Sequence, residues 1–238
     1  MRLRAEDGRF LRIAHRGAAA LADENSLAAI EAGLAADVDI VEFDVLEVGG
    51  RLVVAHAPEL AVPDGPTLDD ALELARASRP DVGLDVDLKW HGFEEKVVDA
   101  IRRHGLVERT LISSCFAPSL RAVRTLEPSL ATAFAYPFDR YRASERRVVP
   151  EALVRATLAG MKRALPARVQ RMLARAEADV ATVHWLVISP RLVERCHAMG
   201  AAVWAWTVND ASVIESVAAA GVDGIVSDDP RLFQRPKL

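Results

Sequence analysis

The sequence predicts an α/β fold, a single (β/α)8 TIM barrel, from two observations. Short apolar runs alternate with helix-like stretches from one end of the 238 residues to the other, which is typical of repeated βα units. No linker rich in Pro, Gly or Ser and no shift in composition divides the chain, so we expect one domain over residues 1–238. An open doubly wound sheet is the alternative, but its glycine-rich phosphate loop is missing after the first strand.

About eight parallel strands are expected, together with the return strand of a hairpin. Each is a short apolar run bounded by polar or turn-forming residues. The expected strands cover residues 11–14, 38–45, 52–55, 82–88, 110–113, 131–135, 180–183, 202–207 and 224–226. The second and third of these runs flank a pair of glycines, which predicts a β-hairpin after the second strand.

Helices are expected between the strands, and several have recognisable ends. Asn25 and Ser26 precede a first amphipathic helix, and Thr67 is a candidate N-cap for the second. Glycines end three of the later helices. Those later helices are expected over residues 93–104, 119–126, 150–178, 192–199 and 212–220.

Composition excludes several classes of protein. Hydrophobic residues make up 51% and charged residues 27%, which is ordinary for a globular chain and argues against disorder. A net charge of −4 argues against a dedicated nucleic-acid binder. Two cysteines are too few for a disulfide scaffold. The charged first residues do not resemble a signal peptide, and no apolar run approaches the roughly 18–20 residues of a membrane span. We therefore expect a cytoplasmic protein.

Titratable side chains stand at the ends of four apolar strand-like runs. His15 follows the first run, Glu42 and Asp44 end the second, His56 ends the third and Asp87 ends the fourth. Burying such groups costs free energy unless the strand tips converge on a site. Parallel α/β proteins bind ligands outside the carboxyl ends of their strands. Carboxylates indicate Mg²⁺ or Ca²⁺, and two histidines indicate acid/base chemistry.

Two cations accompany this set. Arg16 directly follows the first histidine, and Lys89 lies two residues after the last carboxylate. Guanidinium and ammonium groups beside a cation site indicate that the reacting group is a phosphate.

The hairpin decides which of these side chains share a face. A two-residue turn at 49–50 would place Phe43 opposite His56, on the face away from the carboxylates. A three-residue loop at 49–51 would place Asp44 opposite His56 instead. We expect the three-residue loop, because hairpins with a glycine bulge are common and the proposed site requires both groups on one face.

An ordered series of motifs over nearly the whole chain resembles the glycerophosphodiester phosphodiesterases. The series comprises His15-Arg16-Gly17, Glu24-Asn25-Ser26, Glu42-x-Asp44, His56, Asp87-x-Lys89, Ser113-Ser114, Trp206-Thr207-Val208-Asn209 and the segment from Gly221 to Asp228. The resemblance implies a TIM barrel, one divalent cation (Mg²⁺ or Ca²⁺), and phosphodiester cleavage assisted by two histidines.

The resemblance also implies roles for particular residues at the catalytic centre. The metal ligands would be Glu42, Asp44 and Asp87. The acid/base pair would be His15 and His56.

Five further residues would bind the substrate. By the same resemblance, Arg16 and Lys89 would hold the phosphate oxygens. Trp206 would wall the pocket against the alcohol portion, and Glu24 and Asn25 would complete a polar rim.

Three departures from the family pattern bear on the substrate. Ala57 stands where the family generally has Asp, and Asp87 stands where it usually has Glu. Only residues 58–65 separate His56 from the next helix, where the family usually inserts a small subdomain. The missing insertion and the Asp-Leu-Lys motif also resemble the barrel phospholipases D, which lack His-Arg-Gly.

We predict metal-dependent hydrolysis of a glycerophosphodiester to an alcohol and glycerol phosphate. The alternatives are phospholipase D-like cleavage of lysophospholipid or sphingolipid head groups, and a non-catalytic phospholipid-binding barrel. Without the insertion, a wider mouth bounded by Trp206, Phe116 and the segment after Tyr136 would suit a substrate with an acyl chain. Lysophospholipids are thus expected to be at least as good substrates as glycerophosphodiesters, and no nucleic acid is expected as a partner.

A basic stretch follows this segment. Residues 139–175 hold ten basic and three acidic side chains. The stretch is either a solvated helical face or a cationic lip that makes transient contact with an anionic phospholipid surface.

Overall fold

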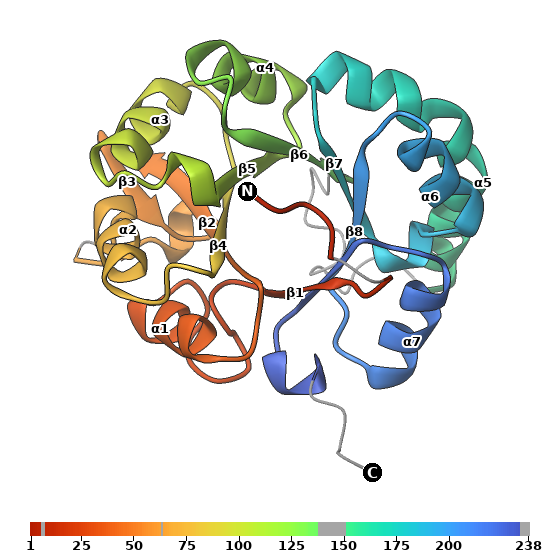
Figure 1. Cartoon of the computed structure of the whole chain (residues 1–238), viewed down its shortest axis with the longest axis horizontal. Coiled ribbons are helices and arrows are strands. Elements are labelled where there is room, and N and C mark those ends of the chain that lie inside the picture. Colours follow the sequence, from red (N-terminus) through yellow and green to blue (C-terminus); the bar gives the residue numbers. More distant parts are fainter. Residues whose placement is uncertain (6–7, 63, 138–150, 234–238) are drawn as a thin grey trace.

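The computed structural model describes residues 1–5, 8–62, 64–137 and 151–233, and within them eight parallel strands form a closed barrel surrounded by helices (Figure 1). The barrel strands are β1 (Leu11–Ala14), β2 (Ile40–Val48), β4 (Gly83–Leu88), β5 (Thr110–Ser114), β6 (Ala131–Tyr136), β7 (Val180–His184), β8 (Ala202–Trp206) and β9 (Gly224–Ser227). The remaining strand, β3 (Arg51–Val54), pairs antiparallel with β2.

The barrel closes because β1 pairs with a strand on each side. Ile13 is the register partner of Ile40 in β2 and of Val226 in β9. The predicted (β/α)8 barrel is therefore confirmed, and the alternative of an open sheet is wrong. Strand ends differ from the predicted ones by up to three residues, most clearly in β2, which continues to Val48.

Seven α-helices lie between the strands in the described ranges: α1 (Leu27–Ala35), α2 (Leu68–Ala77), α3 (Glu94–Arg103), α4 (Ala117–Leu126), α5 (Glu151–Ala176), α6 (Pro190–His197) and α7 (Ala211–Ala219). The predicted caps are confirmed. Ser26 accepts a hydrogen bond from the backbone N–H of Ala29, and Thr67 forms a reciprocal capping box with Asp70.

Apolar side chains fill the inside of the barrel toward the amino ends of its strands. Leu11, Ile40 and Trp204 belong to this cluster and are almost fully buried. The indole N–H of Trp204 donates to the backbone oxygen of Leu3, 3.1 Å away, so the N-terminal segment lies against this end of the barrel (Figure 1). Since this end is filled, a ligand has room only at the carboxyl ends of the strands.

The predicted register of the hairpin is wrong. Val48 pairs with Arg51, which leaves a two-residue turn of Gly49 and Gly50. Both glycines have positive φ, 56° and 83°, which suits a tight primed turn whose twist matches the paired strands. Because both central residues are glycines, the shorter turn needs no bulge.

His56 nevertheless lies on the face of the carboxylates. The register pairs of the two strands end at Val45 and Val54, and a last backbone hydrogen bond runs from the N–H of Ala55 to the oxygen of Asp44 at 3.1 Å, so His56 lies just beyond the ladder. The imidazole Nδ1 of His56 lies 3.1 Å from Asp44 Oδ2. His56 and Asp44 thus share a face, as predicted, although the predicted register that led to this expectation is wrong.

Candidate active site

A cavity of about 680 Å³ opens at the carboxyl ends of the strands. Seven of the ten predicted site residues line it: His15, Arg16, Glu42, His56, Asp87, Lys89 and Trp206. Asp44 is fully buried among them, and Asn25 is 6% exposed. Glu24 lies in an adjoining hollow together with His15 and Arg16. The fold therefore gathers the predicted residues at one end of the barrel.

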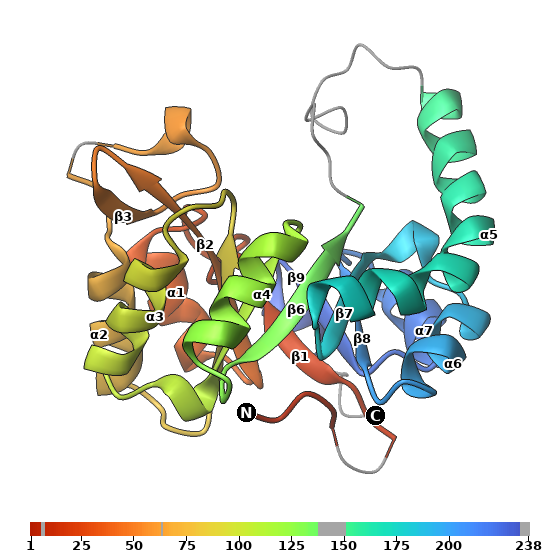
Figure 2. The same ribbon diagram turned by 90° about the horizontal axis from the view of Figure 1, so that it is seen from above.

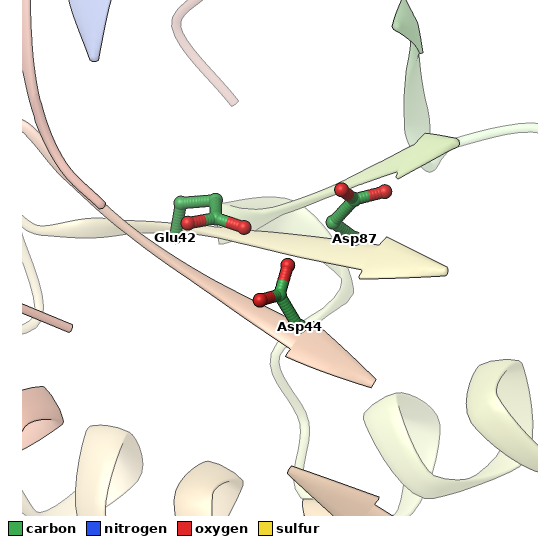
Figure 3. A group of neighbouring side chains, drawn as sticks. All are labelled: Glu42, Asp44 and Asp87. Atoms are coloured by element: carbon green, nitrogen blue, oxygen red, sulfur yellow. The ribbon is translucent and has the colours of Figure 1, made fainter. Parts of the chain in front are cut away.

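Three carboxylates form a cluster at this site (Figure 3). Glu42 and Asp44 come from β2, and Asp87 is the register partner of Asp44 on β4. One ligand oxygen of each lies within 4.8 Å of the others. The ammonium group of Lys89 lies 2.6 Å from Asp44 Oδ1 and 2.5 Å from Asp87 Oδ2. Alternation along one strand and pairing between two strands thus bring three acids to one point.

Burial and charge act in opposite directions on the two acids of β2. Burial, followed by the charge of Asp44, raises the pKa of Glu42 well above its ordinary value. Burial also opposes ionisation of Asp44, but the charge of Lys89 and the hydrogen bond from His56 outweigh it and hold the pKa of Asp44 well below its ordinary value. Asp44 is therefore ionised at neutral pH, and Glu42 is the acid that lacks sufficient compensating charge.

The cluster fits a divalent cation. Its donors are carboxylate oxygens, which Mg²⁺ and Ca²⁺ prefer. The charges of Lys89 and Arg16 do not compensate the buried carboxyl groups fully, because the pKa of Glu42 remains raised. A bound cation would supply the missing positive charge, with Glu42, Asp44 and Asp87 as its ligands.

His15 is oriented by a carboxylate that the sequence prediction did not assign. Its Nδ1 lies 2.6 Å from Asp228 Oδ1, so that nitrogen carries the proton and donates it. The other nitrogen, Nε2, lies 3.9 Å from Glu42 Oε2. The side-chain amide of Asn209 donates to Asp228 Oδ2, and the side-chain oxygen of Asn209 accepts from the backbone N–H of Asp228. This arrangement directs Nε2 of His15 toward the carboxylate cluster.

The missed residues carried a signal. Asp228 directly follows β9, and Asn209 lies shortly after β8, so both satisfy the rule that polar groups gather at carboxyl ends of strands. Burial opposes ionisation of Asp228, but its hydrogen bond to His15 lowers the pKa of Asp228 below the ordinary value. Asp228 is therefore an ionised partner that favours the protonated Nδ1 of His15.

Replacing Asp228 by asparagine is expected to lower kcat by about 10–100-fold while leaving KM nearly unchanged, by analogy with partners that orient catalytic or metal-bound histidines. The carboxamide accepts only through its oxygen and carries no charge, so it holds the Nδ1–H of His15 more weakly. Steady-state kinetics test this positioning role through the split between kcat and KM. An unchanged kcat would contradict it.

The backbone of Arg16 adopts a left-handed conformation that lets it contact Glu42. Its φ is +50°, and its backbone N–H donates to Glu42 Oε2 at 2.7 Å. Its guanidinium lies 2.6 Å from Glu24 Oε2 and 3.3 Å from Asp44 Oδ2. The following glycine is required, since a Cβ on Gly17 would lie 2.4 Å from the backbone of Ala29 in α1. Gly17, in the segment that follows β1, thus makes the close contact with α1.

Asn25 supports the buried aspartate. Its side-chain amide donates to Asp44 Oδ2 at 2.8 Å, and its oxygen accepts from the backbone N–H of Asp44 at 3.0 Å. Its φ of +58° turns the side chain inward from the loop before α1. The described contacts of Asn25 are thus with Asp44, and its predicted contact with substrate stays a prediction.

Aromatic side chains form two parts of the cavity wall. The indole N–H of Trp206 donates to the backbone oxygen of Thr182 at 3.1 Å, and its ring meets His184 edge to face. Across the cavity, Trp90 stacks on His91 with ring centroids 5.4 Å apart and meets the edge of Phe116 at 5.5 Å. Trp90 is 58% exposed, so this second group forms an open apolar shelf at the mouth.

A fourth acid, Asp85, lies deeper on β4 beside Glu42. It is 2% exposed, and its Oδ1 has no hydrogen-bond partner among the described residues. Burial raises the pKa of Asp85 to about 8, although a hydrogen bond to Ser113 opposes the rise. Asp85 is therefore held neutral over a pH range in which the unfolded chain has lost this proton.

This shift predicts a pH-dependent gain in stability for Asp85→Asn. Because the folded state keeps the proton and the unfolded state releases it, the free energy of unfolding should fall by up to about 1.4 kcal/mol per pH unit as the pH rises above the unfolded value toward 8. The stabilisation by Asp85→Asn should thus be about 2–3 kcal/mol larger at pH 7.5 than at pH 5. Urea unfolding in EDTA measures it, and Asp81→Asn at the surface is the control. An equal effect at both pH values would contradict the assignment.

The family model of the glycerophosphoryl diester phosphodiesterases matches residues 15–65 and 66–232. The chain belongs to this family. As a member it is a phosphoric diester hydrolase, with the TIM barrel that the resemblance implied. The break between the two matched parts falls directly after residues 58–65, where the sequence indicated a missing insertion.

A curated relative agrees with this membership, and solved structures share the fold. A glycerophosphodiester phosphodiesterase of Caldanaerobacter subterraneus subsp. tengcongensis is 28% identical over 92% of this chain and 93% of its own length. The crystal structure of a putative glycerophosphoryl diester phosphodiesterase from Silicibacter pomeroyi has a TM-score of 0.76 and 24% identity, covering 98% of this chain and 94% of that one. A phosphodiesterase of Oleispira antarctica in complex with its product sn-glycerol-3-phosphate has a TM-score of 0.69 and 22% identity, with 93% and 94% covered.

Among the described residues, no helix combines the length and the apolar character that crossing a membrane requires.

Proposed function

We propose that this family member hydrolyses glycerophosphodiesters to an alcohol and glycerol phosphate, with one divalent cation and with His15 and His56 as the acid/base pair. The observation that supports this most is that both imidazoles adjoin the carboxylate cluster. His15 Nε2 lies 3.9 Å from Glu42, and His56 Nδ1 lies 3.1 Å from Asp44. The relatives named for this reaction support the same substrate class.

The positions of the cavity residues fit separate roles in phosphate binding and proton transfer. Arg16 and Lys89 bind non-bridging phosphate oxygens, since both present cationic groups at the cavity. One histidine removes a proton from the attacking hydroxyl, and the other donates a proton to the leaving alkoxide. The attacking group is either a water molecule or the neighbouring hydroxyl of the substrate, which would give a cyclic phosphate first. Glu42, Asp44 and Asp87 would hold the cation, which would stabilise negative charge on the phosphoryl oxygens.

The second candidate substrate class is the lysophospholipids. The shelf of Trp90, His91 and Phe116 at the mouth supports it, together with apolar cavity residues such as Leu46 and Phe93. Each CH₂ buried on such a surface contributes about 0.8 kcal/mol to binding. Closure of the mouth by the segment after Tyr136 falls on residues 138–150, which lie outside the described part of the chain.

Hydrolysis of matched substrates tests these proposals. Glycerophosphocholine and lysophosphatidylcholine share a head group and differ in the acyl chain, so their kcat/KM values are compared below the critical micelle concentration, with products followed by phosphorus NMR. Glycerol phosphate and choline as products support the proposed reaction. A much higher kcat/KM for glycerophosphocholine would exclude the acyl-chain subsite, and release of phosphocholine from either substrate would contradict the proposed bond cleavage.

A further inference from the structure

Charge is distributed unevenly in this protein. The whole chain has a net charge of −4, but residues 155–176 of α5 contain six basic side chains and no acidic one. All six are exposed: Arg155, Lys162, Arg163, Arg168, Arg171 and Arg175. Such segregation creates a local positive potential on an otherwise acidic molecule.

The apolar side of α5 is already used by the protein. Leu165, Val169 and Leu173 are each 2% exposed and belong to a core cluster with residues of β7 and β8. These apolar side chains of α5 therefore pack on the barrel, and its basic side chains point outward. The first half of α5 rises beside the mouth of the barrel, above the carboxyl ends of the strands (Figure 2).

The exposed apolar side chains gather at the same end of the molecule. Val62, Trp90 and Leu60 are 60%, 58% and 50% exposed, more than any other large hydrophobic residue in the described ranges. Leu60 ends the short 3₁₀ helix Pro58–Leu60 and Val62 follows it, while Trp90 follows β4. Figure 2 shows the β2–β3 hairpin and the segment after it rising on the opposite side of the mouth from α5.

We propose that this end of the barrel docks on the surface of an anionic phospholipid bilayer. Leu60, Val62 and Trp90 enter the interfacial region, where exposed aliphatic groups lose contact with water and a tryptophan ring finds both apolar and polar surroundings. The basic side chains of the first half of α5, Arg155, Lys162 and Arg163, face the anionic head groups, which attract Lys and Arg near the membrane surface.

A lipid surface accounts for both features at once. Nucleic acid would satisfy the arginines but would leave the three apolar side chains in water. The cavity opens between the two sides of this surface, so a phosphodiester that leaves the bilayer would enter it without crossing bulk water. The inference goes beyond the proposed hydrolysis, and its test requires no turnover.

Sedimentation with vesicles tests the docking surface, using the full chain in EDTA so that no substrate is consumed. Vesicles of phosphatidylcholine with 30% phosphatidylglycerol should bind the protein at least about tenfold more tightly than pure phosphatidylcholine. Raising the NaCl concentration from 0.1 to 0.5 M should weaken this binding by a similar factor, because salt screens exposed charges. A duplex DNA fragment in place of the vesicles should not bind comparably.

Matched variants separate this face from the rest of the surface. Arg163→Glu and the double variant Leu60→Ser/Val62→Ser should each weaken vesicle binding by about tenfold or more. Arg195→Glu in the last turn of α6 and Met199→Ser shortly after it alter exposed residues of the same kinds, basic and apolar, and these variants should bind as the unchanged protein does. Equal binding to both kinds of vesicle, no binding to either, tighter binding to DNA, or equal losses in the α6 controls would each overturn the proposal. Unfolding curves confirm that every variant is folded.

Discussion

Replacing His15 or His56 by alanine is expected to lower kcat for phosphodiester hydrolysis by about 10²–10⁴-fold. Each imidazole adjoins the carboxylate cluster: His15 lies beside Glu42 and Asp228, and His56 lies beside Asp44. The variants should still bind the cation, because the carboxylates are retained. Steady-state kinetics with saturating Mg²⁺ or Ca²⁺ measure the loss.

His104→Ala provides the control for this experiment. That imidazole contacts Asp69 on the outer surface, at the end of α3, and lies outside the cavity. Its replacement should leave kcat within about twofold. Substantial activity in either active-site variant with the cation bound would refute the assignment of that histidine.

Glu42→Gln is expected to raise the dissociation constant of the cation by about 100-fold or more, since it removes one of three charged ligands. Because burial raises the pKa of Glu42, the neutral glutamine resembles the form that the cation-free protein already holds. Its unfolding temperature in EDTA should therefore equal or exceed that of the unchanged protein. The cation-dependent rise in that temperature should be lost.

Calorimetric titration with Mg²⁺ and Ca²⁺ measures the affinity, and Glu73→Gln on the outer surface of α2 is the control. Affinity in the unchanged protein should also fall as the pH is lowered, because cation binding requires the carboxyl groups to release their protons. Unaltered affinity in Glu42→Gln would remove this residue from the ligand set.

The barrel could be predicted from sequence because its signals are local and repeated. Apolar runs, the caps at Ser26 and Thr67 and the glycines that end helices each act within a few residues. The site could be predicted in outline because the ends of parallel strands converge whatever the lengths of the intervening helices.

The hairpin register depended on a feature that spacing alone does not decide. Gly49 and Gly50 can form either a two-residue turn or part of a bulged loop, and the choice follows from φ values of the folded chain. Two contacts between segments distant in the sequence were equally hidden. Asn25 holds Asp44 across 19 residues, and Asp228 holds His15 across 213 residues, so neither follows from a local pattern.

The basic stretch shows where sequence left two interpretations open. Leu165, Val169 and Leu173 face the core, which accounts for the apolar half of the pattern. The exposed basic side chains of α5 fit both a solvated helical face and a cationic lip, and vesicle binding distinguishes the two interpretations. The first part of the stretch, residues 139–150, lies outside the described chain.

The most direct test of the central claim is the rate of glycerophosphocholine hydrolysis by protein freed of metal with EDTA and then supplied with Mg²⁺, Ca²⁺ or Mn²⁺. We predict no measurable choline release in EDTA and a rise of at least about 100-fold with one of these cations. Full activity in EDTA would contradict the metal-dependent mechanism. No turnover with any of the three cations would contradict the enzyme assignment for this substrate and favour a barrel that binds phospholipid without cleaving it.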